Sequence, residues 1–433
     1  MSQLHVRQAK AIKGEIKIPG DKSISHRAIM IGSIAKGETN VSGFLASADC
    51  LATIDCFRKM GIAIQTDDSN HVIVKGKGLR GLEKPGQRLY VGNSGTTIRL
   101  LSGILAGQDF ISEISGDESI QRRPMGRIAK PLRLMGGEIQ GRKERDKPGE
   151  LFPPLKITGG KLNGISYELP VASAQVKSAI LLAGLYANGE TTVIEKNYSR
   201  DHTERMLEHF GAPIAKQGET VRLTPAKELS ANEVDVPGDI SSAAFFMAAA
   251  TLIPGSEVRI RNVGLNPTRT GILDILHRMG GAVEVENEVI GSGEPRGDIV
   301  VRSAQLRGIK IDGAIIPRII DEIPIIAVLA SQAEGFTEIR DARELRVKES
   351  DRIKTIAAEL GKFGVTIEEL EDGLRILGPA KLKGGAIESR GDHRIAMAMA
   401  IAGLVATGPT VINDADCVET SFPGFIDRLQ PFI

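Results

Sequence analysis

The sequence predicts an α/β protein of two similar domains, each built from three copies of one repeated unit. Each copy reads as an apolar strand, a Gly-containing turn, a second strand, a polar loop and an amphipathic helix. Glycine follows the helix in five copies, because it adopts the left-handed backbone conformation that closes a helix. These helix ends are spaced by 75, 75, 69 and 84 residues, at Met60-Gly61, Met135-Gly136, Phe210-Gly211, Met279-Gly280 and Phe363-Gly364.

The sixth copy lacks strands at the end of the chain. Its helix, around Pro423 to Leu429, runs into the C-terminus, whereas Leu4–Ile18 supplies strands before any helix. We therefore expect the first residues to complete the last repeat, and both termini to lie in one domain.

Chain length also favours two domains, because 433 residues exceed the usual size of one domain. If the first residues complete the last repeat, the predicted domains are residues 20–235 and residues 1–19 plus 236–433. The chain then crosses between the domains twice, and both crossings carry Pro-Gly-Asp, near Gly20 and near Pro237. We expect these crossings to act as hinges.

Four predicted helices are apolar on most faces: Ser25–Ala35, Val176–Ala187, Ser241–Leu252 and His393–Val405. Helices of this kind are buried. The pattern therefore predicts helices inside and sheets outside, the reverse of a TIM barrel. A ligand is expected between the two domains, where clefts usually lie.

Composition narrows the function. The net charge is +1, which argues against nucleic-acid binding by bulk electrostatics. The N-terminal residues lack the apolar core of a signal peptide, and the apolar stretches are too short to span a bilayer, so we expect no membrane partner. Three scattered cysteines indicate a reducing cytoplasm, and no His or Cys pattern suggests a zinc site.

Six polar loops precede the apolar helices, and each supplies Ser, Thr, Asp or Asn for helix capping. Three of the loops also place a cation near the helix start: Lys22 with Arg27, Arg99, and Arg394. A cation there opposes the helix dipole, whereas an anion site would require it. Capping alone explains any single loop, but the repeated cations predict an anionic ligand.

Two further segments are dense in charge. If Leu345–Arg352 is helical, Lys348 and Arg352 share one face with Glu349 beside them, although a solvated, salt-bridged face is the common alternative. Asp321-Glu322 precedes a strongly apolar helix. Capping explains one of these acids and leaves the other near a buried surface, where its pKa could suit proton transfer.

Five segments resemble the motifs of the 5-enolpyruvylshikimate-3-phosphate synthase family, in order along essentially the whole chain: Gly20–Arg27, Gly92–Thr96, Arg123–Met125, Arg346–Arg352 and Gly391–Arg394. The resemblance implies two domains of three βαβαββ units each, arranged as an inside-out α/β barrel. It implies transfer of the enolpyruvyl group from phosphoenolpyruvate to the 5-hydroxyl of shikimate 3-phosphate, with release of phosphate, in the shikimate pathway to chorismate and the aromatic amino acids.

The resemblance also implies roles for single residues. Asp321 is the expected base, and Glu349 and Lys22 are the candidates at the methylene carbon. Shikimate 3-phosphate would contact Lys22, Ser23, Arg27, Ser173, Gln175, Ser199, Arg200, Asp321 and Lys348. Phosphoenolpyruvate would contact Lys22, Asn93, Gly95, Arg123, Gln175, Arg352 and Arg394. No metal or organic cofactor is required, and we expect a monomer.

Two alternative functions are less consistent with the sequence. The UDP-N-acetylglucosamine enolpyruvyl transferases share the fold but carry a cysteine on the loop that matches Gly116–Arg123, and this chain has none there. A non-catalytic phosphate-metabolite binding protein would not need Asp321, Glu349 and Lys22, all of which are present.

The chain departs from one branch of the family at two positions. Ala174 replaces the second serine of a Ser-Ser-Gln motif, and Thr420 stands where that branch has lysine. Ser173–Lys177 and Arg200–Glu204 resemble instead the branch known for tolerance to the inhibitor glyphosate, although Gly95 is retained. We therefore predict intermediate to low glyphosate sensitivity.

Overall fold

The computed structural model describes residues 2–147 and 149–432. The chain folds into two compact units. The first unit consists of Gly20–Val236 together with Gly291–Glu294, and the second contains the residues up to Pro19, Pro237–Ile290 and the chain from Pro295 onward. Gly291–Glu294 is the tip of a long hairpin whose two strands otherwise belong to the second unit.

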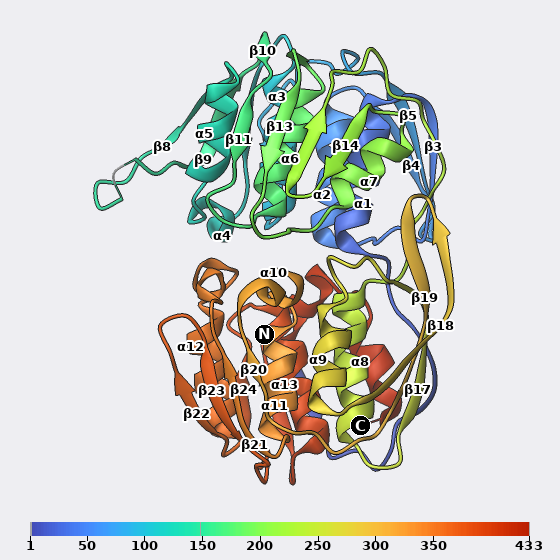
Figure 1. Ribbon diagram of the computed structural model, residues 1–433, viewed down its shortest axis with the longest axis vertical. Coiled ribbons are helices and arrows are strands. Elements are labelled where there is room, and N and C mark those ends of the chain that lie inside the picture. Colours follow the sequence, from blue (N-terminus) through green and yellow to red (C-terminus); the bar gives the residue numbers. More distant parts are fainter. Residues whose placement is uncertain (1, 148, 433) are drawn as a thin grey trace. The chain divides into compact units, whose positions relative to one another are not determined.

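Three buried helices form the centre of the first unit: α1 (Lys22–Ile34), α3 (Gly95–Ala106) and α6 (Ala174–Gly184). Sheets lie around them on the outside (Figure 1). The first sheet has the order β16 (Val234–Asp235), β3 (Lys36–Ser42), β5 (Val72–Lys77), β4 (Ala63–Thr66). The second is β6 (Leu89–Tyr90), β7 (Ile111–Ser115), β9 (Phe152–Thr158), β8 (Glu138–Arg142), and the third is β11 (Ser166–Glu168), β13 (Thr191–Ile194), β15 (Thr220–Leu223), β14 (Ile214–Gln217).

Smaller elements complete the first unit. The outer helices are α2 (Ala48–Lys59), α4 (Glu118–Gln121), α5 (Gly126–Leu134) and α7 (His202–His209), and β10 (Leu162–Asn163) pairs with β12 (Ala187–Asn188).

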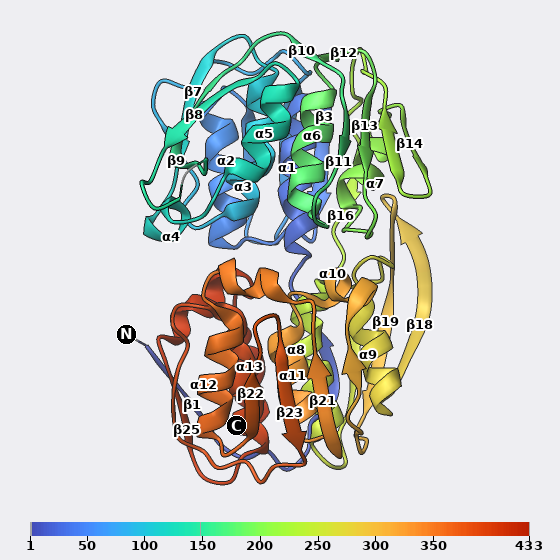
Figure 2. The same ribbon diagram turned by 60° about the vertical axis from the view of Figure 1, so that its left-hand side comes forward.

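The second unit repeats this plan around α8 (Ile240–Leu252), α11 (Ile323–Ser331) and α13 (His393–Val405) (Figure 2). One sheet is β18 (Ala282–Gly291), β19 (Glu294–Arg302), β17 (Glu257–Gly264), β2 (Lys13–Lys17). Another is β20 (Lys310–Ile311), β21 (Gly335–Ile339), β23 (Leu374–Gly378), β22 (Thr366–Glu369), and the last is β1 (Gln3–Val6), β25 (Thr410–Asn413), β24 (Ala386–Glu388). The outer helices are α9 (Gly271–Met279), α10 (Ile316–Ile319), α12 (Arg352–Lys362) and α14 (Phe425–Leu429).

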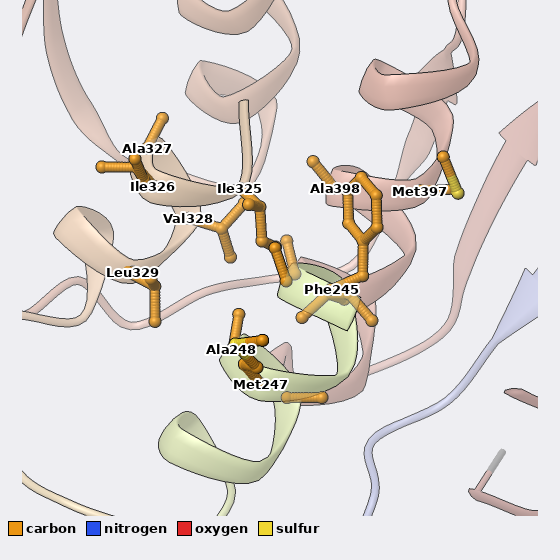
Figure 3. Packing of buried hydrophobic residues seen from close by; sticks show 14 of the residues in the cluster. Phe245, Met247, Ala248, Ile325, Ile326, Ala327, Val328, Leu329, Met397 and Ala398 are labelled. Atoms are coloured by element: carbon orange, nitrogen blue, oxygen red, sulfur yellow. The ribbon is translucent and has the colours of Figure 1, made fainter. Parts of the chain in front are cut away.

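The central helices are hydrophobic all round and are buried, as predicted. Every residue of α11, and every residue of α8 from Ile240 to Thr251, is buried. Figure 3 shows the side chains of α8, α11 and α13 meeting in the core of the second unit, Phe245, Ile325 and Ala398 among them. Since all their faces contact other elements, only the ends of these helices reach the surface, and the polar loops are located there.

Strand pairing shows how the repeats connect. The strand before a central helix pairs in parallel with the strand after it, as β6 with β7 around α3 and β24 with β25 around α13. At the two crossings between the units, the strand before the central helix pairs instead with a strand of the unit that it leaves. β2 precedes α1 but pairs with β17, and β16 precedes α8 but pairs with β3. β1 pairs with β25, so the N-terminal strand completes the last sheet, as predicted.

The glycines after the outer helices were predicted to be left-handed, and this is confirmed. The φ angles are 83° at Gly61, 105° at Gly136, 83° at Gly211, 91° at Gly280 and 89° at Gly364.

Some helix bounds differ from the prediction. Helix α1 starts at Lys22 rather than at Ser25, because Asp21 caps it by accepting from the Ile24 N–H. Within the described residues, no helix is long and apolar enough to cross a membrane.

Candidate active site

The predicted N-caps are present at five of the six central helices. The capping side chains accept a hydrogen bond from a backbone N–H of the first turn, and they are Asp21, Ser94, Ser173, Asp239 and Asp392. None of the six central helices, all of which lie in the described residues, has an acidic residue in its first turn. The caps of α3 and α6 are neutral serines, so the positive ends of these two helices can attract an anion.

The exception is α11, where one acid of Asp321-Glu322 was expected to act as the cap. Glu322 holds the N-cap position but, among the described residues, makes no side-chain capping bond. Its backbone is helical rather than extended, and Pro324 removes one of the N–H groups that a cap would satisfy. Glu322 is instead buried and accepts a hydrogen bond from Ser241.

Lys22 and Arg27 project from the first two turns of α1. The Lys22 ammonium lies 3.2 Å from the Asp49 carboxylate and is 18% exposed. Arg27 is buried, and its guanidinium donates to the Ser23 carbonyl, to Thr203 and to Ser178 at 2.7–2.9 Å. Burial lowers the pKa of Arg27 to about 10. Arg27 is therefore held in one orientation with its charge near the helix start.

Ser199 and Arg200 follow β13 and lie in the same part of the first unit. The charge of Arg200 adds to the lowering of the pKa of Arg27. Ser199 is buried and donates through its hydroxyl, at 2.7 Å, and through its N–H, at 3.0 Å, to Glu195. Lysine, arginine and hydroxyl groups on neighbouring segments suit a phosphoryl group.

A second group surrounds the start of α3. Arg123 donates to the Asn93 side chain at 2.7 Å. A Cβ atom added to Gly95 would lie only 3.0 Å from Arg123 and 3.2 Å from Arg99. Arg99 donates in turn to Gln175 at 2.6 Å, and Gln175 donates to Thr96 at 3.2 Å. The structure thus brings together the predicted residues Asn93, Gly95, Arg123 and Gln175, and Arg99 joins them.

The second unit contains a cluster around Asp321. Three cations lie near its carboxylate oxygens: Lys348 at 3.9 Å, Arg352 at 3.5 Å and Arg394 at 3.8 Å. Asp321 is 15% exposed, so solvent screens these charges only partly. Burial lowers the pKa of Lys348, and Asp321 opposes that shift without cancelling it.

Arg352 also contacts Glu349, whose carboxylate accepts from it at 2.7 Å. All five residues predicted in this unit, Asp321, Lys348, Glu349, Arg352 and Arg394, therefore form one connected group. With three cations and two carboxylates, the group offers both anion-binding and proton-accepting atoms.

The charged run Leu345–Arg352 is not one helix, so the condition under which Lys348 and Arg352 would share a helix face is not met. A 3-10 helix, η2 (Arg343–Val347), ends before Lys348, which is extended, and α12 begins only at Arg352. Asp351 interrupts the run because its side chain caps α12 by accepting from the Lys354 N–H. Lys348 and Arg352 nevertheless reach the same carboxylate, because the chain turns between them.

Sequence reasoning did not single out several buried charged residues that hold the predicted ones. Asp392 contacts Arg352, Asp49 contacts Lys22, and Glu195 contacts Ser199. Asp392 lies in one of the motifs that resemble the family. Asp49 and Glu195 lie in no such motif, and the sequence does not show which residues they contact, 27 and 4 residues away along the chain. Among the described residues, no group of three His, Cys, Asp or Glu side chains is arranged to hold a metal ion.

Residues 6–429 match the family described as EPSP synthase (3-phosphoshikimate 1-carboxyvinyltransferase). The chain belongs to the EPSP synthase family. A 3-phosphoshikimate 1-carboxyvinyltransferase from Brevibacillus brevis is 56% identical over 426 residues, which cover 98% of this chain and 99% of that protein. One from Bacillus cereus (strain G9842) is 55% identical over 97% of this chain and 96% of that protein.

Solved structures agree with this assignment. The EPSP synthase from Acinetobacter baumannii superposes with a TM-score of 0.88 at 48% identity, over 99% of this chain and 98% of that one. The enolpyruvyl transferase NikO from Streptomyces tendae has the same fold, with a TM-score of 0.79 at 18% identity over 99% and 97% of the chains. The EPSP synthase family and its two-domain α/β fold, both expected from the sequence, are confirmed.

Proposed function

We propose that this EPSP synthase acts as the 3-phosphoshikimate 1-carboxyvinyltransferase of its host. It transfers the enolpyruvyl group of phosphoenolpyruvate to the 5-hydroxyl of shikimate 3-phosphate and releases phosphate, a step of the shikimate pathway to the aromatic amino acids. We also propose that it works as a cytoplasmic monomer, and that its two compact units are the two predicted domains.

One observation supports the site assignment above the others: Asp321 lies within 4 Å of Lys348, Arg352 and Arg394. Three cations gathered at one place are suited to multiply anionic substrates, which can compete with Asp321 and Glu349 for them. Phosphoenolpyruvate carries a phosphate and a carboxylate, and arginine forks bind both groups through two parallel hydrogen bonds. Arg352 and Arg394 would bind these groups, together with Arg123 near Asn93 and Gly95.

The acceptor is assigned to the other predicted residues. Lys22, Ser23 and Arg27 at the start of α1, Ser173 and Gln175 at the start of α6, and Ser199, Arg200 and Lys348 would hold shikimate 3-phosphate. Asp321 would contact its 5-hydroxyl, and Lys22 and Gln175 would also contact phosphoenolpyruvate. Helix starts and cations together bind the phosphoryl group and leave the neutral hydroxyl free to react.

The addition step needs two proton transfers, and the elimination of phosphate reverses the first of them. An acid, Glu349 or Lys22, protonates the methylene carbon of phosphoenolpyruvate, which makes the adjacent carbon cationic. The 5-hydroxyl oxygen attacks that carbon while Asp321 takes the hydroxyl proton. The methyl group of the resulting intermediate then loses a proton, the carbon–carbon double bond forms again, and the bond to phosphate breaks. Carboxylates beside the cationic carbon stabilise it electrostatically.

The test is phosphate release from phosphoenolpyruvate, with shikimate 3-phosphate or UDP-N-acetylglucosamine as acceptor. We expect release with shikimate 3-phosphate only, and its loss in Asp321→Asn. Asp312→Asn is the matched control, because Asp312 pairs with Lys310 at the surface. Release with the nucleotide sugar alone would overturn the acceptor. A folded protein that binds shikimate 3-phosphate without turnover would instead be a binding protein.

A further inference from the structure

A buried charge cluster lies in the first unit beyond the residues assigned above. Lys177 on α6 is fully buried, and its ammonium lies 2.7 Å from Glu195 and 2.6 Å from Glu204. Glu195 is also fully buried, and Glu204 is 8% exposed. Burying three charges is costly unless they are paired, and removing one partner leaves the others uncompensated. Stability alone does not require such a cluster, since apolar residues of similar size are often as stabilising.

The cluster joins the segments that carry the proposed acceptor-binding residues. Lys177 follows Ser173 and Gln175 by one turn or less on α6, and its ammonium donates to the Ser199 carbonyl at 3.4 Å. Glu195 accepts from both the N–H and the hydroxyl of Ser199. The Ser199 backbone is thus fixed on both sides of its Cα atom by one ion pair.

Glu204 extends the cluster toward Arg27. It lies on α7 next to Thr203, whose hydroxyl accepts from Arg27 at 2.7 Å. Burial raises the pKa of Glu204, and the Lys177 ammonium opposes this shift. Burial by itself would lower the pKa of Lys177, but Glu204 and Glu195 outweigh it and raise that pKa. Lys177 therefore keeps its charge and can hold both carboxylates.

The hydroxyl of Ser199 has one proton, and in this structure it donates that proton in a hydrogen bond to the Glu195 carboxylate. A phosphoryl dianion accepts hydrogen bonds and donates none. The Ser199 proton must therefore turn from Glu195 to the phosphoryl oxygen when that group binds. During this turn the N–H contact to Glu195 and the carbonyl contact to Lys177 remain available to hold the residue in place.

We propose that Lys177 and Glu195 are positioning residues that present Ser199 to the phosphoryl group of the acceptor. Neither residue touches the substrate. They act through Ser199, and so they set the preference for a phosphorylated acceptor over the same acceptor without its phosphoryl group. This inference rests on the proposed function, because it assigns the phosphoryl end of the acceptor to Ser199.

The test is a double-mutant cycle on the full-length protein, read by calorimetric titration with shikimate 3-phosphate and with shikimate. Lys177→Met and Ser199→Ala should each weaken shikimate 3-phosphate binding by about tenfold, the value expected for a hydrogen bond to a charged group. The double variant should be no weaker than the single variants, because both changes remove the same contact. Binding of shikimate, which has no phosphoryl group, should stay within about twofold in all three variants.

The matched control is Lys196→Met. Lys196 is the neighbour of Glu195 and pairs with Glu168 at 2.6 Å, but it is 70% exposed. We expect its binding of both compounds to equal that of the wild type. If Lys177→Met does not fold, Glu195→Gln takes its place in the same cycle with the same criteria.

Three results would overturn the inference: losses that multiply in the double variant, equal weakening of shikimate and shikimate 3-phosphate, or unchanged binding of shikimate 3-phosphate by Lys177→Met. The wild-type titration separates this from the proposed function. A wild type that does not bind shikimate 3-phosphate contradicts the function itself, whereas normal binding by both the wild type and Lys177→Met contradicts only the role of Lys177.

Discussion

Arg352 and Asp392 form a buried ion pair with two contacts. The Arg352 Nε atom donates to one Asp392 oxygen at 2.8 Å and an Nη atom donates to the other at 3.2 Å. Arg352 is 1% exposed and Asp392 is fully buried. Burial alone would lower the pKa of Arg352, but the carboxylates of Asp392, Glu349 and Asp321 together outweigh it and raise that pKa. Asp392 also accepts from Ser350 and caps α13, so one carboxylate joins three parts of the second unit.

The first prediction concerns this pair. Asp392→Asn keeps the cap but removes the carboxylate that makes two contacts with the buried Arg352 guanidinium. Glu349 and Asp321 are then left to balance the Arg352 charge. We therefore expect a loss of about 3 kcal/mol in the free energy of unfolding. We also expect the KM for phosphoenolpyruvate to rise, because Arg352 loses its orientation. Denaturant titration and steady-state kinetics measure both effects.

The control for this prediction is Asp351→Asn. Asp351 caps α12 and pairs with Arg346 at a site that is 34% exposed, and asparagine caps equally well. Its free energy of unfolding should change by less than about 1 kcal/mol. Equal losses of unfolding free energy in the two variants would contradict the prediction, because they would show that the buried Arg352–Asp392 pair stabilises the fold no more than the partly exposed Arg346–Asp351 pair.

A second prediction concerns the space at Gly95. Because a Cβ atom there would lie 3.0 Å from Arg123 and 3.2 Å from Arg99, Gly95→Ala should displace both guanidinium groups by a few tenths of an ångström. We expect the KM for phosphoenolpyruvate to rise about tenfold, since small misplacements of binding groups are costly. Gly361→Ala, on α12 with nothing within 4 Å of the added atom, is the control. An unchanged KM in Gly95→Ala would contradict the proposed anion site.

The third prediction is a pH dependence of stability that originates at His26. His26 is fully buried, its Nδ1 atom lies 2.7 Å from Thr53, and burial lowers its pKa well below 6.5, with Lys22 and Arg27 adding to the shift. Between the lowered pKa and 6.5 the unfolded chain binds the proton and the folded chain does not. Stability is therefore fully present above about pH 6.5 and is lost as the pH falls.

Replacing His26 by glutamine should remove this loss. We expect the wild type to lose about 1 kcal/mol more than His26→Gln between about pH 6.5 and about pH 5.5. Urea titrations at several pH values measure the difference, and His71→Gln, at a partly exposed position, serves as the control. Parallel pH profiles for the wild type and His26→Gln would refute the assignment.

A fourth prediction is that glyphosate inhibits this protein only weakly to moderately. The basis is the resemblance of Ser173–Lys177 and Arg200–Glu204 to the tolerant branch, with Gly95 retained. Inhibition constants measured against phosphoenolpyruvate test it. Competitive inhibition as tight as the binding of phosphoenolpyruvate would show the prediction to be wrong.

The repeats made much of the fold predictable. Residue spacing located the left-handed glycine after the five outer helices α2, α5, α7, α9 and α12, and the apolar helices were buried as expected, since both features depend on local sequence. The strand exchange at the crossings was not predictable in detail. β2 pairs with β17 across more than two hundred residues, and such a pairing depends on tertiary structure rather than on local pattern.

The site was predictable only in part, for a related reason. Cations at helix starts oppose the helix dipole, so Lys22 and Arg394 indicate an anion site from the sequence alone. Their supporting carboxylates, such as Asp49 and Glu195, have no such signature, since any acidic residue is most often exposed. The interruption of Leu345–Arg352 at Asp351 was also not predictable, because the i, i+4 spacing of Lys348 and Arg352 is compatible with a continuous helix.

The most direct test of the account identifies the product. Phosphoenolpyruvate labelled with ¹³C at its central carbon is incubated with shikimate 3-phosphate and the protein, and ¹³C NMR follows the label. We expect an enol ether in which the labelled carbon is bonded to the oxygen at position 5, formed together with one equivalent of phosphate. Phosphate released with labelled pyruvate as the only product, or a bond to any other oxygen of the acceptor, would contradict it.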